Sequence, residues 1–531
     1  MKAQVSFPTT DLRLLPNTLV FFFLLSGMTF IGSAGSSNVE RWRPQDFAFQ
    51  SSAPGIDNPF HGSFTATAEG PAGISFETLG FFDGDNTWKI RFAPTKAGIW
   101  TLTTRSDLPD LDGKTIEFEC VENTNPNVHG GLRVDPDHPR HFVYEDGTRY
   151  YPMGYECDWL WALDMGNEGL PTLLPFLDKL AGSGFNYLIL NGYAHDTSWR
   201  KGKTEERDYG PPPLFPWGGS NEKPDHSRFN LDYWRHYDRV IEALYERGMT
   251  AHLMIKVYNK KVKWPKRNSA EDDLYFKWLV ARYAAYPNVL WDFSKESYNE
   301  KDQGYKIDRL QLVRESDPYD RLTTLHDDKD YDTGAYDEVA DFHADQNHKD
   351  WRKRILSQRK RREWPVVNVE FGYEHGIGGP EDKTYGQAQP PEEVARRAWE
   401  ICMAGGYIAY YYTNTAWDVI HPDETPPGYA YMKNLGEFFE STRYWLMEPV
   451  DKIVDGGYCL AGDGEIVVYL PSNDPVSIDL SGQSSDLRGE WFHPFTGDRE
   501  EEGDFAPGEQ EITPPADWGD GPFVLRLRTR E

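Results

Sequence analysis

The chain has 531 residues, which exceeds one ordinary domain and predicts roughly two to four compact units. Hydrophobic residues make up 39% and charged residues 27%, a globular composition that excludes a disordered chain and a membrane-embedded one. The formal net charge of −29 argues against a nucleic-acid partner, because the summed field repels a polyphosphate.

The N-terminus has the features of a secretory signal peptide. An apolar run over residues 19–30 has the length of a signal-peptide core and is too short to span a bilayer, and Gly32 and Ala34 suit a cleavage site. We therefore predict a signal peptide over residues 1–34 and a secreted or periplasmic protein, without stable membrane insertion after cleavage. The long, weakly basic start leaves an uncleaved anchor, and hence attachment at the cell surface, as an alternative.

The cysteines and the basic stretches give weaker signals. The four cysteines lie far apart, without metal-type spacing, and we predict no disulfide between them: Cys120, Cys157, Cys402 and Cys459. Two basic stretches, 256–267 and 349–362, interrupt the acidic composition. They are either solvated faces or local positive charge near a site for a sulfated or uronic sugar.

Both ends of the mature chain are rich in short strands. Polar and apolar residues alternate over 63–67 and 88–92, with turn residues between the runs, which predicts an Ig-like antiparallel sandwich over residues 36–128. Similar strands past Met447 predict a second, smaller β-sandwich over residues 448–531.

Residues 129–447 alternate between apolar strands and amphipathic helices, which predicts a (β/α)8 barrel. The eight strands are expected from Met153 and at 185–190, 250–255, 288–293, 322–326, 340–343, 366–370 and 407–412. A long loop over 193–225, rich in Gly, Pro and charge, follows the second strand and is expected to form a lid or a wall of the cleft. The predicted fold is thus a barrel between two β-sandwiches.

Two glutamates follow predicted barrel strands, where the chemistry of such barrels lies. Glu296 ends the fourth strand and Glu370 the seventh. Glycoside hydrolysis needs one protonated and one ionised carboxyl group, and a separation of roughly 5–5.5 Å gives retention through a covalent intermediate. Because the fourth and seventh strands face each other across the barrel mouth, we predict that this pair is catalytic.

These motifs resemble those of clan GH-A glycoside hydrolases. The segment 286–296 (YPNVLWDFSKE) is similar to the fourth-strand motif that ends in the acid/base, and Glu370 in VVNVEFGYE matches the seventh-strand nucleophile. Trp417 resembles the eighth-strand tryptophan below the sugar subsite. The resemblance, which covers nearly the whole mature chain, implies a retaining enzyme with an Ig-like N-terminal domain, an apiosidase-like barrel and a C-terminal β-sandwich.

One residue departs from the clan pattern. Lys295 replaces the Asn that usually precedes the acid/base and bonds the sugar 2-hydroxyl. A lysine can contact a 2-oxygen, favour an anionic substituent, or raise the acidity of Glu296. Asn299-Glu300 is a rival acid/base with the expected Asn, but it lies further past the strand end.

Other polar residues near strand ends are expected to bind the hydroxyl-rich substrate. The predicted substrate-binding residues are Tyr155, Asp158, Asn191, His195, Lys256, Lys295, His326, His343, Tyr373 and Trp417. Of these, His326 and His343 are expected beside Glu370, where an imidazole holds a carboxylate ionised and oriented.

The sequence thus predicts a secreted hydrolase of plant or algal poly- or oligosaccharides that needs no cofactor and no metal. One alternative is a carbohydrate-binding barrel without turnover. Another is a metal-dependent barrel hydrolase with ligands among His326, Asp327, His343, Asp345 and His348. The sugar, the linkage and the oligomeric state stay open, and the long loop hints at exo action.

Overall fold

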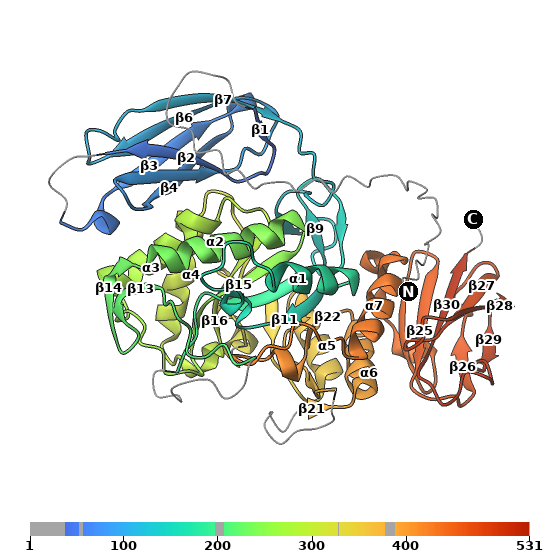
Figure 1. Cartoon of the computed structure of the whole chain (residues 1–531). Coiled ribbons are helices and arrows are strands. Elements are labelled where there is room, and N and C mark those ends of the chain that lie inside the picture. Colours follow the sequence, from blue (N-terminus) through green and yellow to red (C-terminus); the bar gives the residue numbers. More distant parts are fainter. Residues whose placement is uncertain (1–37, 52–56, 197–206, 328, 378–387, 530–531) are drawn as a thin grey trace, which may run out of the picture.

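The computed structural model describes residues 38–51, 57–196, 207–327, 329–377 and 388–529. An all-β part, a barrel with its helices outside, and a second all-β part follow one another along the chain (Figure 1). This architecture confirms the predicted fold class, while the boundaries between the parts remain predictions. The predicted signal peptide lies outside the described residues.

The N-terminal part forms a β-sandwich. Its strands are β1 Asn38–Glu40, β2 Gln45–Gln50, β3 Phe64–Glu69, β4 Ser75–Phe82, β5 Thr87–Phe92, β6 Gly98–Ser106 and β7 Thr115–Val121. Strand β4 pairs with β3 through Leu79 and then with β5 from Gly80, so it passes from one sheet to the other. Phe47 and Phe118 pack between the sheets, with ring centroids 5.1 Å apart.

The central sheet is a parallel barrel of eight strands. They are β11 Met153–Glu156, β12 Tyr187–Asn191, β15 Thr250–Val257, β16 Val289–Lys295, β17 Thr323–Thr324, β18 His343–Asp345, β19 Val366–Asn368 and β22 Tyr407–Tyr411. A parallel bridge between His326 and Ala344 joins the two ends of the sheet. The strand predicted over 340–343 begins only at His343, and the one predicted over 322–326 has two residues.

The barrel helices begin where side chains satisfy their free N–H groups. They are α1 Leu173–Gly182, α2 Leu231–Glu246, α3 Ala270–Tyr283, α4 Gln303–Ser316, α5 Trp351–Arg361, α6 Pro391–Cys402 and α7 Gly428–Glu440. Asn230, Ser269 and Asp302 accept hydrogen bonds from backbone N–H groups in the first turns of α2, α3 and α4.

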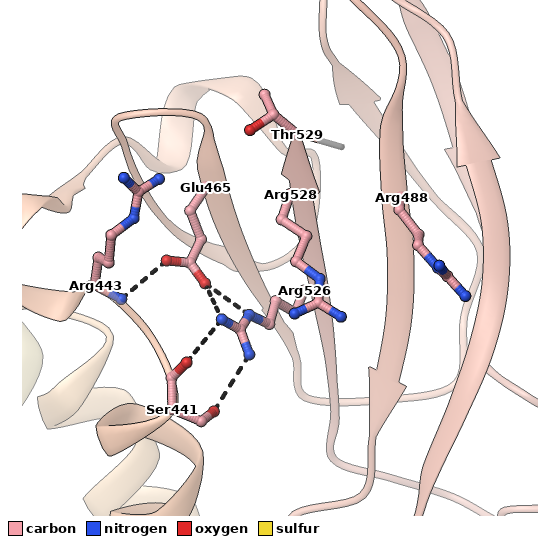
Figure 2. Close-up of a pocket in the computed structure, with 7 residues that line it drawn as sticks. All are labelled: Ser441, Arg443, Glu465, Arg488, Arg526, Arg528 and Thr529. Carbon is pink, nitrogen blue, oxygen red and sulfur yellow. Dashed lines mark hydrogen bonds and ion pairs between the residues drawn. The ribbon is translucent and has the colours of Figure 1, made fainter. Parts of the chain in front are cut away.

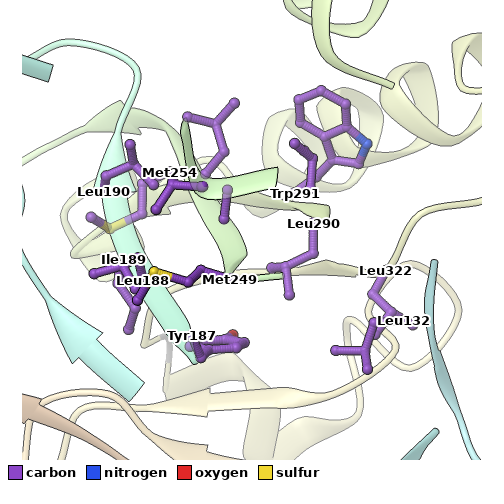
Figure 3. Packing of buried hydrophobic residues seen from close by; sticks show 14 of the residues in the cluster. Leu132, Tyr187, Leu188, Ile189, Leu190, Met249, Met254, Leu290, Trp291 and Leu322 are labelled. Atoms are coloured by element: carbon purple, nitrogen blue, oxygen red, sulfur yellow. The ribbon is translucent and has the colours of Figure 1, made fainter. Parts of the chain in front are cut away.

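Apolar packing fills the barrel wall. All five residues of β12 are buried, because the sheet is covered by helices on one face and by the barrel interior on the other (Figure 3). His252 inside the barrel is bonded on both ring nitrogens, by Tyr187 at 2.7 Å and by Asp292 at 2.6 Å. Both ring nitrogens of this buried imidazole are therefore hydrogen-bonded.

The connections before and between the barrel strands and helices contain short strands and 3-10 helices. The additional strands are β8 Leu132–Val134, β9 Phe142–Tyr144, β10 Arg149–Tyr150, β13 Trp217–Ser220, β14 Lys223–Phe229, β20 Tyr373–Glu374 and β21 Ala388–Gln389. The 3-10 helices are η1 Pro59–His61, η2 Pro71–Gly73, η3 Leu160–Ala162, η4 Ser297–Asn299, η5 Lys329–Thr333, η6 Thr413–Thr415, η7 Tyr444–Leu446 and η8 Asp451–Ile453. The stretch predicted as a loop over 193–225 contains β13 and the start of β14, a hairpin that the sequence analysis missed; residues 197–206 lie outside the described part.

The C-terminal part has a six-stranded sheet and a two-stranded one. Its strands are β23 Glu448–Pro449, β24 Tyr458–Gly462, β25 Glu465–Leu470, β26 Val476–Asp479, β27 Leu487–Phe492, β28 Arg499–Phe505, β29 Glu509–Ile512 and β30 Phe523–Thr529. Ile478 and Ile512 of the small sheet share one apolar cluster with Trp491 and Leu525 of the large sheet. The two sheets therefore face each other across a core of their own.

All four cysteines are buried and free. Among the described residues, no helix combines the length and the apolar character that crossing a membrane requires.

A buried ionic network joins the N-terminal sandwich to the barrel. Arg91 of β5 reaches Asp238 of α2 at 3.1 Å and the main-chain oxygen of Arg282 at 2.8 Å. Arg282, fully buried, also pairs with Asp238. Burial alone raises the pKa of Asp238, but the two guanidinium groups hold it below the usual aspartate range. The carboxylate of Asp238 is thus the shared counter-ion of two buried arginines.

We expect Asp238→Ala to destabilise the protein by roughly 3–5 kcal/mol, because it leaves two buried guanidinium groups without their shared partner. A lower thermal midpoint in a melting experiment checks this. Asp308→Ala, which removes an exposed carboxylate on α4, is the control. Equal midpoints for the two variants would contradict the role of Asp238.

Candidate active site

Glu370 lies two residues beyond β19, at the carboxyl end of the barrel, and is 4% exposed. Its Oε1 accepts a hydrogen bond from the hydroxyl of Tyr373. Its Oε2 lies 3.7 Å from the Lys295 ammonium and 3.6 Å from the Nε2 of His326. The predicted seventh-strand carboxylate therefore has three polar neighbours that favour its charged form.

The pKa of Glu370 is set by two opposing effects. Burial raises the pKa of this carboxyl group, whereas the charge of Lys295 and the His326 and Tyr373 groups lower it more strongly. The net result lies below the usual glutamate range. Glu370 is therefore ionised at neutral pH, as a nucleophile must be.

Lys295, the last residue of β16, is the centre of a buried charge cluster. Its ammonium pairs with Glu156, lies 3.4 Å from Asp158 and 3.7 Å from Glu370, and is 1% exposed. Burial lowers the pKa of Lys295, but Asp158, Glu156 and Glu370 raise it well above its ordinary value. We define these four residues as the lysine cluster, which carries three carboxylates for one ammonium.

Glu296 follows Lys295 directly and has a left-handed backbone, with φ of 51°. The side-chain amides of Asn259 and Asn299 donate to its two carboxylate oxygens, at 2.8 and 3.0 Å. The rival acid/base Glu300 instead accepts from Arg267 at 2.7 Å. Asn299, predicted as the partner of Glu300, contacts Glu296, which favours Glu296 as the acid/base.

The charges of Glu296 and Glu370 both affect the pKa values of Tyr298 and His348. Burial and then a hydrogen bond from Tyr298 to Glu296 raise the pKa of that tyrosine, and both carboxylates contribute by their charge. Burial lowers the pKa of His348, and Glu370 and Glu296 both oppose that shift. Lys295, which directly precedes Glu296, lies 3.7 Å from Glu370, so both carboxylates lie at the mouth of the barrel and border the space there.

Trp417 lies on the eighth-strand side of the same space, with its ring 5.3 Å from the Lys295 ammonium. The ammonium of Lys260 is 3.7 Å from the centre of the ring, so it covers one face of it. A sugar can stack on that face only after the lysine side chain has moved. On the same side, the hydroxyl of Tyr411 on β22 donates a hydrogen bond to Asp158 at 2.8 Å.

A cavity of about 570 Å³ is lined in part by Tyr298, although neither Glu296 nor Glu370 lines it. Its polar lining includes Asp327, Asp345, Gln346 and Arg354, from the ends of the fifth and sixth strands and from α5. This volume holds a few sugar rings and offers charged and amide groups to their hydroxyls.

Three predicted substrate-binding residues lie elsewhere. The Tyr155 hydroxyl bonds Thr415 and Tyr429, in the layer between strands and helices. Lys256 bonds Asp272 of α3 at 2.6 Å. Because successive side chains of a strand point to opposite faces, Glu156 faces the barrel interior while Tyr155 faces the helices.

The third is His343, which was expected beside Glu370. Its ring packs on Tyr331, with centroids 4.1 Å apart, and on Trp364 at 5.7 Å. Its Nε2 is 4.0 Å from Asp345. Of the two predicted imidazoles, only His326 contacts the carboxylate.

Asn191 and His195 lie beside an aromatic group at the end of β12. The Asn191 side-chain oxygen accepts from Trp161 at 3.0 Å, and the His195 ring is 6.3 Å from that of Trp159. Trp159 and Trp161 stack at 5.0 Å. These residues line the region next to the lysine cluster, but no contact with Glu296 or Glu370 follows from this arrangement.

The structure adds Glu156, Asn259, Tyr298 and Tyr411 to the predicted substrate-binding residues, and the charges of both glutamates reach His348, which was expected only as a ligand in the metal-dependent alternative. Glu156 lies among the polar residues that end the first predicted strand. Asn259 lies in a loop and left no periodic signal.

In the part of the chain that the structure describes, two groups of residues have donor atoms close enough for a metal ion: Glu156 with His326 and Glu370, and Asp327 with His343 and Asp345. In the first group the Lys295 ammonium already contacts both carboxylates. In the second, Arg354 donates to Asp345 at 3.0 Å. Cationic side chains thus balance the acidic ligands in both groups.

Comparison with known proteins agrees with this geometry. The family model described as the apiosidase-like catalytic domain matches residues 137–446, and that of a domain of unknown function, DUF5060, matches residues 38–107. No curated protein matches the sequence.

Solved structures share the fold. The structure of a candidate glycoside hydrolase from Bacteroides vulgatus covers 93% of this chain and 100% of its own, with a TM-score of 0.75 and 22% identity. A glycoside hydrolase family 5 protein from the same species covers 75% of this chain and 93% of its own, with a TM-score of 0.58 and 19% identity.

We expect Lys295→Met to reverse the acid dependence of stability. In the wild type, the lowered pKa of Glu370 contributes stability that is lost as the pH falls below the ordinary glutamate value of 4.5. Without the ammonium, the rise that burial causes in the pKa of Glu370 is no longer offset, so the variant gains stability as the pH falls from 7 towards about 5.

Thermal midpoints across this pH range measure the effect. Lys277→Met, at an exposed position of α3, is the matched control and should follow the wild type. A Lys295→Met variant that loses stability steadily on acidification would contradict the lysine cluster.

Proposed function

Because the chain belongs to the family of apiosidase-like catalytic domains, we propose that it is a secreted retaining glycoside hydrolase of plant or algal poly- or oligosaccharides, with Glu370 as nucleophile and Glu296 as acid/base. The observation that carries the proposal is that both glutamates follow barrel strands at the same end, with the Lys295 ammonium, next to Glu296 in the chain, 3.7 Å from Glu370. They come from the fourth and seventh strands of a barrel whose shape matches solved glycoside hydrolases.

The proposed reaction has two steps. In the first, Oε2 of Glu370 attacks the anomeric carbon and the bond to the leaving oxygen breaks, while Glu296 donates its proton to that oxygen. In the second, Glu296 takes a proton from water, whose oxygen displaces Glu370 from the anomeric carbon. Glu296 ends protonated and Glu370 ionised, so the cycle closes.

The neighbours of Glu370 support this assignment. Tyr373 bonds Oε1, whereas Oε2 accepts no hydrogen bond from the described residues. One oxygen is thus held and the other can attack, with its charge stabilised by Lys295 and His326 nearby. Positioning of this kind lowers the barrier because the reacting atom needs no reorientation.

We further propose that the sugar bound for attack is neutral. The carboxyl groups of Glu156, Asp158 and Glu370 surround the Lys295 ammonium. The Lys295 ammonium is already paired with this cluster, so it has little attraction left for a substrate anion. The contacts of Lys295 support a role that the sequence analysis did not predict, stabilisation of the charge of Glu370.

Secretion rests on the N-terminal sequence, which lies outside the described residues. Two alternatives can be separated by experiment. A binding protein without turnover releases no reducing ends from any glycan, and a metal-dependent hydrolase loses activity with a chelator and regains it with metal.

We expect Glu370→Gln to lower kcat by roughly 10⁴-fold or more and Glu296→Gln by about 10²–10⁴-fold. A screen of neutral and acidic oligosaccharides for released sugars finds the substrate, and kinetics on it measure the losses. Glu300→Gln is the matched control and should retain activity. Full activity in either catalytic variant would exclude the proposed pair.

We expect the product to keep the anomeric configuration of the substrate. Nuclear magnetic resonance of the first-formed sugar, before mutarotation, distinguishes retention from inversion. Retention requires carboxyl groups roughly 5–5.5 Å apart, whereas a first product of inverted configuration would assign Glu370 the role of a general base.

A further inference from the structure

A groove rich in arginine lies where the C-terminal sheet meets the end of α7 (Figure 2). Its volume is about 930 Å³. It is lined chiefly by Ser441, Arg443, Glu465, Arg488, Arg526 and Arg528. Four guanidinium groups around one groove stand out in a chain with a net charge of −29.

Two of these arginines are direct cross-strand neighbours. Arg488 of β27 and Arg528 of β30 occupy paired positions, so their side chains leave the same face of the sheet. Like charges directly opposite each other destabilise a sheet. Among the described residues, Arg528 has no ion-pair partner, whereas Arg488 pairs with Glu501, so Arg528 is the member of this pair whose charge has no carboxylate partner.

One arginine of the groove has a structural role. Arg526, 8% exposed, bonds Glu465 at 2.6 Å and the main-chain oxygen of Ser441 at 2.8 Å. The other oxygen of Glu465 accepts the N–H of Arg443 at 2.9 Å, as Figure 2 shows. This carboxylate is therefore committed to joining the sheet to the barrel, and it is not the counter-ion of Arg528.

The ion-pair partners of Arg488 and Arg443 are exposed carboxylates that a ligand could replace. Arg488 pairs with Glu501, and their side chains are 48% and 68% exposed. Arg443 pairs with Asp463 at similar exposure. Exposed ion pairs contribute little, about 0–1 kcal/mol, so a ligand oxyanion can replace these carboxylates at small cost.

We propose that this groove binds an anionic oligosaccharide, through carboxylate or sulfate groups held by Arg528 and Arg488. Guanidinium groups donate two parallel hydrogen bonds to such oxyanions. The groove has the volume for a few sugar rings, and Ser441 adds a hydroxyl. That the ligand is a sugar rests on the proposed function, whereas anion recognition follows from the charges alone.

The groove is separate from the catalytic space. Ser441 follows the C-terminal end of α7, and in a barrel of this kind that end lies opposite the carboxyl ends of the strands. An anionic glycan would therefore be held by the C-terminal part, while a neutral unit is cleaved at the mouth of the barrel.

The test is calorimetric titration of the full chain with three oligosaccharides of equal length: an oligogalacturonate, a sulfated galactan fragment and a neutral galactan fragment. Inorganic sulfate serves as a fourth ligand. The variants are Arg528→Gln and the double variant Arg488→Gln/Arg528→Gln. The control is Arg105→Gln/Lys114→Gln, which removes two exposed charges from the N-terminal sandwich. Melting curves check that all variants fold.

We expect at least one anionic oligosaccharide to bind more tightly than the neutral one, and the double variant to weaken that binding by about tenfold or more. Which one binds distinguishes carboxylate from sulfate. Unchanged binding in the double variant, equal loss in the control, or equally tight binding of inorganic sulfate or of the neutral fragment would overturn the proposal. Binding is measured without turnover, so an inactive enzyme that still binds would refute only the proposed function.

Discussion

The ion pairing of Lys295 with three buried carboxylates is the constraint on which the active site depends. Glu156 and Asp158 come from the first strand and its end, and Glu370 follows the seventh strand. The Lys295 ammonium, on the fourth strand, therefore links three strands of the barrel. Burying a carboxylate without a counter-ion costs several kcal/mol, and this site buries three. The same ammonium keeps Glu370 charged, so that folding and the proposed chemistry rest on one side chain.

Much of the fold could be predicted because its signals are local. Continuous apolar runs bounded by turn residues mark buried parallel strands, and all eight barrel strands were found in this way. Glu296 and Glu370 were found because a charged residue straight after such a run is rare and falls at the catalytic end of the barrel. The roles of both remain proposals.

The orientation of the other side chains could not be predicted so well. A parallel strand is buried on both faces, and its sequence does not alternate between polar and apolar residues. Tyr155 and Lys256 therefore looked like ligands, although they face the helices. Asn259 owes its position to loop geometry, which has no period from which its direction could be predicted. Of the two histidines expected beside Glu370, His326 lies there, whereas His343 packs on Tyr331 and Trp364.

The closure of the barrel has a consequence for its motions. Strands β17 and β18 are joined by the bridge between His326 and Ala344, which is the shortest strand pairing among the described barrel strands. Local opening is easiest where hydrogen bonds are few. We therefore expect local opening of the barrel to begin between β17 and β18. Such opening would displace His326, the imidazole beside Glu370, before it displaces residues on the opposite side of the barrel.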